Sequence, residues 1–211
     1  MTSTQEKCRL YLISPPMIDL DRFARDLKAA LGAGDVASFQ LRLKDQPDEV
    51  IFRAAEKLIP ICQKYDVAFI LNDNADLARD VGADGVHLGQ SDGSIKDARD
   101  ILGFDEVIGV TCHNSKHLAF EAGEAGADYV AFGAFFPTTT KVTQYVADPD
   151  LIRSWADIAE IPSVAIGGIT PDNCAPLIEA GANFLAVSSA VWNHKAGPAA
   201  AVKAFNKIFA K

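Results

Sequence analysis

The sequence predicts a single α/β domain folded as a (β/α)8 barrel, the TIM barrel, because short apolar strand patterns alternate with helix patterns along the chain. Most of the strand patterns are continuous apolar runs, as expected for a parallel sheet that is buried on both faces. Eight β-α units in 211 residues fit this barrel, whereas the alternative, an open doubly wound sheet, usually has fewer strands. No linker or break in composition divides the chain, so one domain is expected over residues 1–211.

The first half of the chain holds four β-α units, separated by proline, glycine or polar residues. Pro15-Pro16 follows the first strand, Pro47 precedes the second helix, and Gly103 follows the fourth helix. The expected strands cover residues 8–14, 36–41, 69–71 and 85–88. The expected helices cover residues 19–31, 48–65, 75–81 and 94–102.

The second half continues the alternation, with a long polar loop after the sixth strand. The expected strands cover residues 107–111, 129–133, 163–167 and 184–187. The expected helices cover residues 115–125, 149–159, 177–180 and 198–211, and residues 189–192 could form a short additional helix. Pro171 lies close to the first turn of the seventh helix.

A weak internal repeat supports the barrel. The segments 81–86, 125–130 and 180–185 each end a helix with glycine and then begin a strand. Glycine suits the position just after a helix, and the alanine that follows it fits a tight corner between helix and strand.

The composition excludes several classes of partner. The formal net charge of −8 argues against nucleic acid as a ligand, although a small anionic substrate could bind to a local basic cluster. No apolar run approaches the roughly 18 residues needed to span a bilayer, and the polar segment Met1 to Lys7 does not resemble a signal peptide. The four cysteines show no CxxC spacing and are expected to be buried free thiols in the cytoplasm.

Two aspartates follow neighbouring strands of the predicted sheet. Asp73 comes directly after the third strand, and Asp92 follows the fourth. Parallel neighbours lie about 5 Å apart, so both carboxylates would face one space and could bind a hard cation such as Mg²⁺. The alternative is that each aspartate is simply a helix N-cap.

Other polar residues also follow the strands, and in a barrel all these strand ends open onto one mouth, where the active site lies. Gln40, Arg42 and Lys44 alternate with apolar residues, which places the three side chains on one face. The remaining strand ends contribute Asn72, Thr111, Thr138, Thr139, Thr140, Lys141, Gly168, Ser188 and Ser189.

These residues suggest two anion sites. Arg42, Lys44 and Lys141 are cations that would meet the acidic pair, a mixture that fits a diphosphate bridged by Mg²⁺. The glycines at 167–168 and the serines at 188–189 end the seventh and eighth strands, where barrels commonly bind a phosphate.

Each feature also has a purely structural explanation. The two cations after the second strand could be solvated charges, the threonines a plain loop, and the glycine pair a turn. His87 lies in mid-strand and is expected to be a hydrogen-bonded core residue rather than a base. Cys112 is expected to be a buried filler, because no basic partner is evident.

The chain resembles the thiamine-phosphate synthase family over nearly its whole length and in the same order. The matching stretches are residues 40–44, 72–73, 85–92, 109–111, 137–141, 165–169 with Asn173, and 188–189. The resemblance implies an Mg²⁺-dependent transferase that joins an aminopyrimidine diphosphate to a thiazole phosphate.

The family pattern assigns roles residue by residue. Those implied to hold the pyrimidine diphosphate are Gln40, Arg42, Lys44, Asn72, Thr111 and Lys141, with the three cations acting catalytically on the leaving group. Those implied to hold Mg²⁺ are Asp73 and Asp92. Those implied to hold the thiazole phosphate are Thr138, Thr139, Thr140, Gly168, Ser188 and Ser189.

The sequence departs from the family pattern at three places. Leu43 stands where the family usually has Glu, and Ala134 stands where it usually has Pro. The segment 142–146 replaces the second Lys, the Asp and the Gly-rich loop that typically follow Lys141.

Two other functions therefore stay open. One is a related thiazole tautomerase, which tends to lose the metal and diphosphate residues. The other is a barrel that binds thiazole or thiamine phosphates without catalysis. The partners expected are small phosphorylated molecules, and the oligomeric state is left open, with a homo-oligomer as one outcome.

Overall fold

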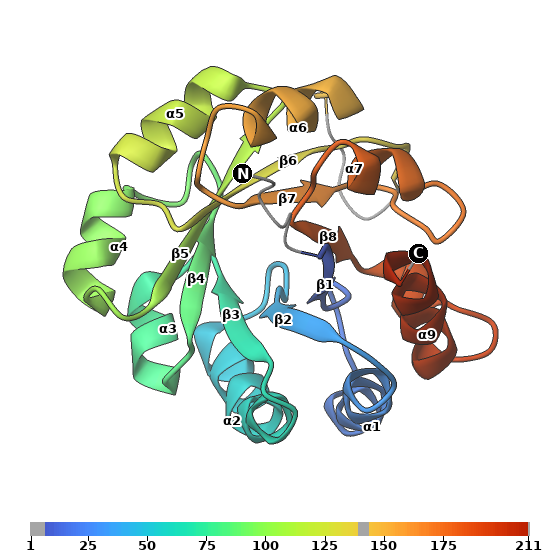
Figure 1. The fold of residues 1–211 in the computed structure, drawn as a ribbon. Helices are drawn as coiled ribbons and strands as arrows, with labels where there is room; N and C mark the ends of the chain where they lie inside the picture. The colour runs from blue at the N-terminus through green and yellow to red at the C-terminus, as the bar shows by residue number, and fades with distance from the viewer. Residues whose placement is uncertain (1–6, 139–143, 211) are drawn as a thin grey trace.

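The computed structural model of the chain describes residues 7–138 and 144–210, and its strands form a closed barrel. The strands pair in the order β1-β2-β3-β4-β5-β6-β7-β8, all parallel, and β1 also pairs with β8. Helices lie around the outside of the strands (Figure 1). This arrangement confirms the (β/α)8 barrel that the sequence predicts.

The strands are short and agree closely with the predicted ranges. They are β1 Arg9–Ile13, β2 Val36–Leu41, β3 Ala68–Asn72, β4 Gly85–Leu88, β5 Val107–His113, β6 Tyr129–Gly133, β7 Ser163–Ile166 and β8 Phe184–Val187. β5 extends two residues further than predicted, because the pairing shifts register after Thr111 and His113 then pairs with Phe132.

The helices follow the strands in regular alternation. They are α1 Leu20–Leu31, α2 Asp48–Lys64, α3 Ala75–Val81, α4 Ile95–Leu102, α5 Lys116–Glu124, α6 Pro149–Ala156, α7 Ala175–Glu179, α8 Ser189–Trp192 and α9 Pro198–Phe209. α6 ends three residues earlier than predicted, at a point where the Trp155 indole donates a hydrogen bond to the carbonyl of Ile161 at 2.9 Å.

The repeated corners have a common structural role that the sequence repeat alone does not reveal. The side chains of Asp84, Asp128 and Asn183, which precede β4, β6 and β8, each accept a hydrogen bond from the backbone N–H at the start of the preceding strand. The donors are Phe69, Ile108 and Ser163, at 2.6, 2.7 and 2.9 Å. Each corner thereby ties two neighbouring strands together at the amino end of the barrel.

The core has two parts. Most buried apolar residues lie between the sheet and the surrounding helices. A smaller cluster that includes Tyr11, Ile13, Tyr129 and Val164 fills the inside of the barrel. The interior is therefore packed with side chains, and a ligand can reach only its rim.

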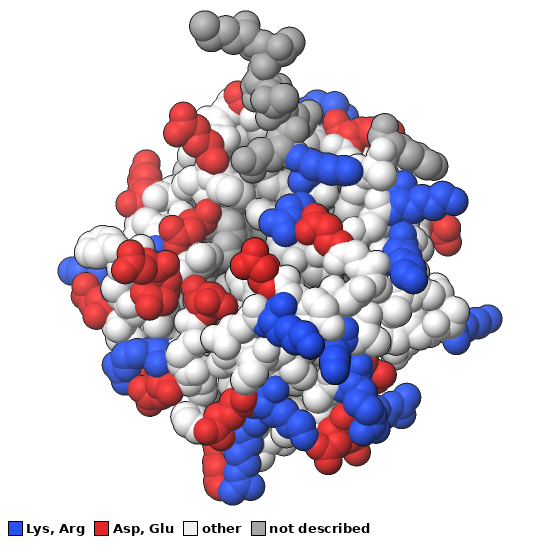
Figure 2. Space-filling view, turned by 60° about the horizontal axis from the view of Figure 1, so that its bottom comes forward, with Lys and Arg blue, Asp and Glu red and all other residues white. Residues whose placement is uncertain are grey.

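The surface is unevenly charged. Acidic side chains gather on the left of the face in Figure 2, on the side where α3 and α4 lie in Figure 1, whereas basic side chains are more frequent on its right and both kinds occur along its lower edge. Within residues 7–138 and 144–210, the helices include none that is long and apolar enough to cross a membrane.

Candidate active site at the barrel mouth

The described candidate residues all lie at or just beyond the carboxyl ends of the strands. Gln40 and Asn72 lie within the last two residues of β2 and β3, and Thr111 lies near the end of β5. The others follow β2, β3, β4, β6, β7 or β8 and are Arg42, Lys44, Asp73, Asp92, Thr138, Gly168, Ser188 and Ser189. Thr139, Thr140 and Lys141 lie outside the described residues, as do the first two residues of the altered segment 142–146.

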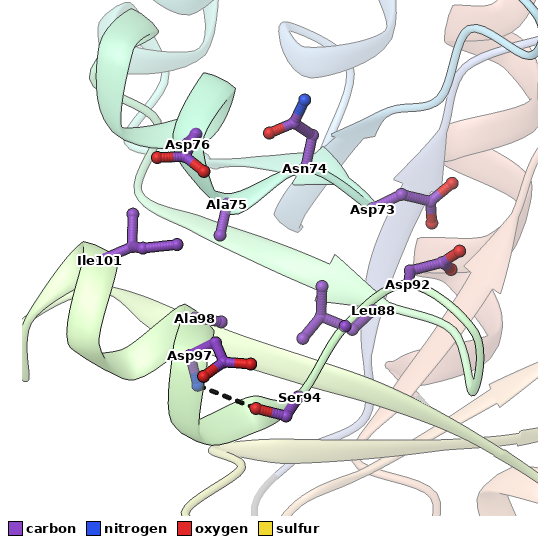
Figure 3. A pocket seen from close by; sticks show the side chains of 11 residues that line it. Asp73, Asn74, Ala75, Asp76, Leu88, Asp92, Ser94, Asp97, Ala98 and Ile101 are labelled. Atoms are coloured by element: carbon purple, nitrogen blue, oxygen red, sulfur yellow. Dashed lines mark hydrogen bonds between the residues drawn. The ribbon is translucent and has the colours of Figure 1, made fainter.

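Asp73 and Asp92 lie side by side at one edge of this mouth (Figure 3). The pKa of Asp73 is raised to about 6, first by burial and then by a hydrogen bond with Asp92 and by its charge, while Lys44 and Arg42 oppose the rise. Asp73 has a backbone φ of 68° and donates its N–H to the carbonyl of His87 at 2.8 Å. A left-handed backbone is uncommon for a residue other than glycine, and such conformations cluster at functional sites.

The structure rules out the helix-cap explanation for this pair. The N-cap of α3 is Asn74, whose side chain accepts from the N–H of Leu77, and the N-cap of α4 is Ser94, whose hydroxyl accepts from Asp97. Neither Asp73 nor Asp92 caps a helix. A carboxylate of Asp92 instead accepts from the N–H of Gly89 at 2.9 Å, within its own loop. The acidic pair therefore needs another explanation.

The pair fits a magnesium ion that a ligand would complete. No cluster of three or more His, Cys, Asp or Glu side chains suitable for a metal occurs in the part of the chain that the structure describes. Mg²⁺, however, is often bound by one or two carboxylates together with waters and substrate phosphates. Burial first, and the neighbouring Asp92 second, raise the pKa of Asp73, and a bound cation would favour its charged form. A cavity of about 360 Å³ adjoins the pair and is also lined by Asp76 and Asp97 (Figure 3).

Arg42 and Lys44 stand close enough to lower the pKa of Asp73. Their backbone is held against the loop after β1, because Arg42 N–H donates to the Ser14 hydroxyl at 2.8 Å and Lys44 N–H donates to the Pro16 carbonyl at 3.2 Å. Among the ion pairs of residues 7–138 and 144–210, neither side chain takes part. Both cations are therefore available to a bound anion.

The opposite side of the mouth is built from backbone. Gly168 has a φ of 64°, and a Cβ on it would lie 2.4 Å from the carbonyl oxygen of Pro137, so a larger residue does not fit there. Asn173 braces this turn by donating to the Gly168 carbonyl at 3.0 Å and accepting from the Thr170 N–H at 2.8 Å. Ser188 precedes the short helix α8 and donates its hydroxyl to the Ser14 carbonyl at 3.3 Å.

His87 is buried and hydrogen-bonded, as the sequence predicts. Its Nδ1 lies 2.9 Å from the Tyr129 hydroxyl, and its Nε2 lies 2.7 Å from the Thr111 hydroxyl. Tyr11 and Tyr129 are polar residues of the barrel interior that sequence reasoning missed. The glycine in the middle of β5, Gly109, is the sequence feature that could have indicated a large side chain packed against this strand. A Cβ at Gly109 would lie 1.9 Å from the Tyr129 ring.

Cys112 is buried, as expected, and burial raises the pKa of its thiol to about 12. A thiol with so high a pKa is a poor nucleophile at neutral pH. All four cysteines of the chain are free and buried.

The family model and the relatives that match this chain all belong to one family. A family model described as thiamine monophosphate synthase matches residues 10–191. The thiamine-phosphate synthase of Rhodospirillum centenum is 60% identical over 95% of this chain and 97% of its own. That of Hyphomonas neptunium is 52% identical over 99% and 98%.

Solved structures agree. Thiamine phosphate pyrophosphorylase from Pyrococcus furiosus has a TM-score of 0.85 and 31% identity, covering 99% of this chain and 98% of its own. Orotidine 5'-phosphate decarboxylase from Pyrococcus horikoshii has a TM-score of 0.67 with 15% identity, covering 95% of this chain and 99% of its own, and therefore shows likeness of fold alone.

Proposed function

Because the chain belongs to the thiamine monophosphate synthase family and is a transferase of thiamine biosynthesis, we propose that its barrel mouth joins 4-amino-2-methyl-5-hydroxymethylpyrimidine diphosphate to hydroxyethylthiazole phosphate. The products are thiamine phosphate and diphosphate. The observation that carries this assignment of the site is the carboxylate pair Asp73 and Asp92, which caps no helix and lies beside two cations. The thiazole tautomerase and the non-catalytic barrel have no need of such a pair.

The first requirement of the reaction is a stabilised leaving group. Diphosphate leaves the methylene carbon of the aminopyrimidine, and the electron-rich ring stabilises the cation that remains. Arg42 and Lys44, together with Lys141, hold the departing diphosphate by charge and hydrogen bonds. Asp73 and Asp92 would hold Mg²⁺, which supplies further positive charge against the phosphate oxygens when it is bound.

The second requirement is alignment of the two substrates. Gln40, Asn72 and Thr111 orient the pyrimidine diphosphate on one side of the mouth. The thiazole phosphate binds on the other side through Thr138, Thr139, Thr140, Gly168, Ser188 and Ser189. The attacking thiazole nitrogen carries no proton, so no general base is needed, and the protein acts by positioning and by keeping water from the cation.

A direct assay tests the proposal. Purified protein is mixed with both substrates, with Mg²⁺ or with EDTA, and thiamine phosphate is measured. We expect product only with Mg²⁺. The variant Asp92→Asn should lose at least about tenfold in rate, a loss of ~1.4 kcal/mol in transition-state stabilisation.

The matched control is Asp97→Asn, which removes a second carboxylate from the same cavity and should leave the rate within about twofold. Folded protein that makes no thiamine phosphate with Mg²⁺ would refute the proposed function. Equal losses of rate in both variants would mean that the overall negative charge of the cavity, rather than the Asp73–Asp92 pair, supports the reaction.

We also propose that one barrel domain carries the whole activity and that the protein works in the cytoplasm. Free cysteine thiols are typical of reducing compartments, and all four cysteines here are buried thiols.

A further inference from the structure

An unbroken chain of hydrogen bonds crosses the inside of the barrel and ends at two residues of the proposed pyrimidine site. It contains five contacts between side chains of six strands, with lengths of 2.7, 3.2, 2.8, 2.9 and 2.7 Å. Its members, in spatial order, are Asn72, Gln40, Tyr11, Tyr129, His87 and Thr111. The four inner members are buried and the two end members are partly exposed at the mouth.

The direction of the first two bonds follows from the Gln40 amide, which has one acceptor oxygen and one donor nitrogen. Its Nε2 donates to Asn72 Oδ1 at 2.7 Å, so its Oε1 faces Tyr11 and accepts the hydroxyl proton at 3.2 Å. A tyrosine hydroxyl has a single proton. At the 2.8 Å contact between the two tyrosines, Tyr129 must therefore be the donor.

The Tyr129 hydroxyl sets the direction of the last two bonds. The proton of Tyr129 is already used, so at the 2.9 Å contact with His87 the ring nitrogen Nδ1 must carry the proton. We take this ring to be neutral, so it has only one N–H. His87 Nε2 is then an acceptor, and the Thr111 hydroxyl donates its proton to it at 2.7 Å.

We propose that this chain of hydrogen bonds runs in one fixed direction and positions the two residues at its ends. Through it, Tyr11, Tyr129 and His87 hold Asn72 as a donor and Thr111 as an acceptor toward the substrate. Asn72 uses its oxygen inside the chain and offers its N–H groups outward. Thr111 uses its proton inside the chain and offers a lone pair outward. Together they match a ring that carries both an unprotonated nitrogen and an amino group, as an aminopyrimidine does, so the inference rests on the proposed function for its substrate.

The surrounding packing holds this chain of hydrogen bonds in one geometry. Tyr11 and Tyr129 contact each other edge to face, with ring centroids 5.9 Å apart, and the Tyr129 ring stacks against His87 at 5.6 Å. The absence of a side chain at Gly109 makes room for the Tyr129 ring. Burial keeps the polar groups of the four inner members away from water, so breaking one of these bonds disturbs its neighbours.

The first experiment measures the His87 tautomer by ¹⁵N NMR of the substrate-free protein at pH 8. We expect proton on Nδ1 and none on Nε2. The Nε2–H tautomer would reverse every bond in the chain, and a doubly protonated ring would break it, so either result overturns the inference. Thr111→Ser keeps the hydroxyl and should preserve the Nδ1–H tautomer, whereas Thr111→Val should alter the Nε2 signal.

The second experiment measures kinetics of Tyr129→Phe, which removes one hydroxyl from the middle of the chain. We expect kcat/KM for the pyrimidine diphosphate to fall about tenfold, while the KM for the thiazole phosphate stays within about twofold. Tyr65→Phe, at the end of α2, is the matched control and should be unchanged. An effect below twofold, or equal losses for both substrates, would mean that Tyr129 has only a structural role.

The two experiments fail separately. The NMR measurement needs no substrate, so a wrong tautomer refutes the polarity of the chain while leaving the proposed reaction standing. A folded protein that keeps the Nδ1–H tautomer but makes no thiamine phosphate would refute the proposed reaction instead.

Discussion

Replacing Asp73 by Asn should stabilise the metal-free protein at alkaline pH, although it removes a residue proposed to be functional. The pKa of Asp73 is raised from 3.8 to about 6, mainly by burial and by Asp92. The folded state therefore binds the proton more tightly than the unfolded state does. The resulting penalty on the free energy of unfolding is absent below about pH 4, grows between these two pKa values and is complete above about pH 6.

The magnitude follows from the pKa difference. Each pKa unit corresponds to ~1.4 kcal/mol, which gives an upper limit of about 3 kcal/mol. Asp73 is partly exposed, so solvent screening reduces the expected gain to ~1 kcal/mol. For a chain of this size such a gain raises the Tm by roughly 2–4 °C.

The assay is urea and thermal unfolding of the parent and Asp73→Asn in EDTA, at pH 8 and at pH 4. We expect the variant to be more stable at pH 8 and equal to the parent at pH 4. Added Mg²⁺ should stabilise the parent and leave the variant unchanged. A variant less stable than the parent at pH 8 in EDTA would show that attraction to Arg42 and Lys44 outweighs the burial and repulsion on which the reasoning depends.

Four further variants test other parts of the structure. Lys141→Ala should slow single-turnover formation of thiamine phosphate more than it weakens thiazole-phosphate binding, and a pure loss of thiazole affinity would contradict its role on the leaving group. Gly168→Ala should raise the KM for thiazole phosphate at least about tenfold in steady-state kinetics, because the Cβ would lie 2.4 Å from a backbone carbonyl; an unchanged KM would remove this turn from the phosphate site. Cys112→Ala should leave turnover within about twofold, since the thiol is buried with its pKa at about 12, and complete loss in folded protein would reveal a nucleophile. Asp128→Ala should lower the free energy of urea unfolding by ~1–3 kcal/mol, because the Ile108 N–H loses its acceptor, whereas an unchanged stability would show that this corner needs no brace.

The local pattern of apolar residues, glycines and prolines is sufficient to predict the architecture. The limits of β2, α3, β4, β6 and β8 coincide with the predicted ranges, because apolar runs, glycines after helices and prolines before them act on neighbouring residues only. Placement of the candidate residues at the mouth also followed from sequence. Once every strand is parallel, the residue after each strand must lie at the same end of the barrel.

Tertiary structure decided which of several suitable residues performs each local task. Asp73, Asn74, Asp92 and Ser94 can all cap a helix by composition, and only the backbone path shows that Asn74 and Ser94 do so. The two aspartates therefore cap no helix, and their carboxylates are available at the mouth of the barrel.

Tertiary structure also decided the polar interior of the barrel. Tyr11 and Tyr129 are separated by 118 positions in the chain and lie on strands that are not neighbours in the sheet, yet their hydroxyls meet at 2.8 Å. No periodicity along the sequence encodes such a contact, because it depends on how the closed sheet brings inward-facing side chains together across its axis. The sequence by itself determined that a barrel forms and which residues reach its mouth, and the closure of that barrel decided which of them touch.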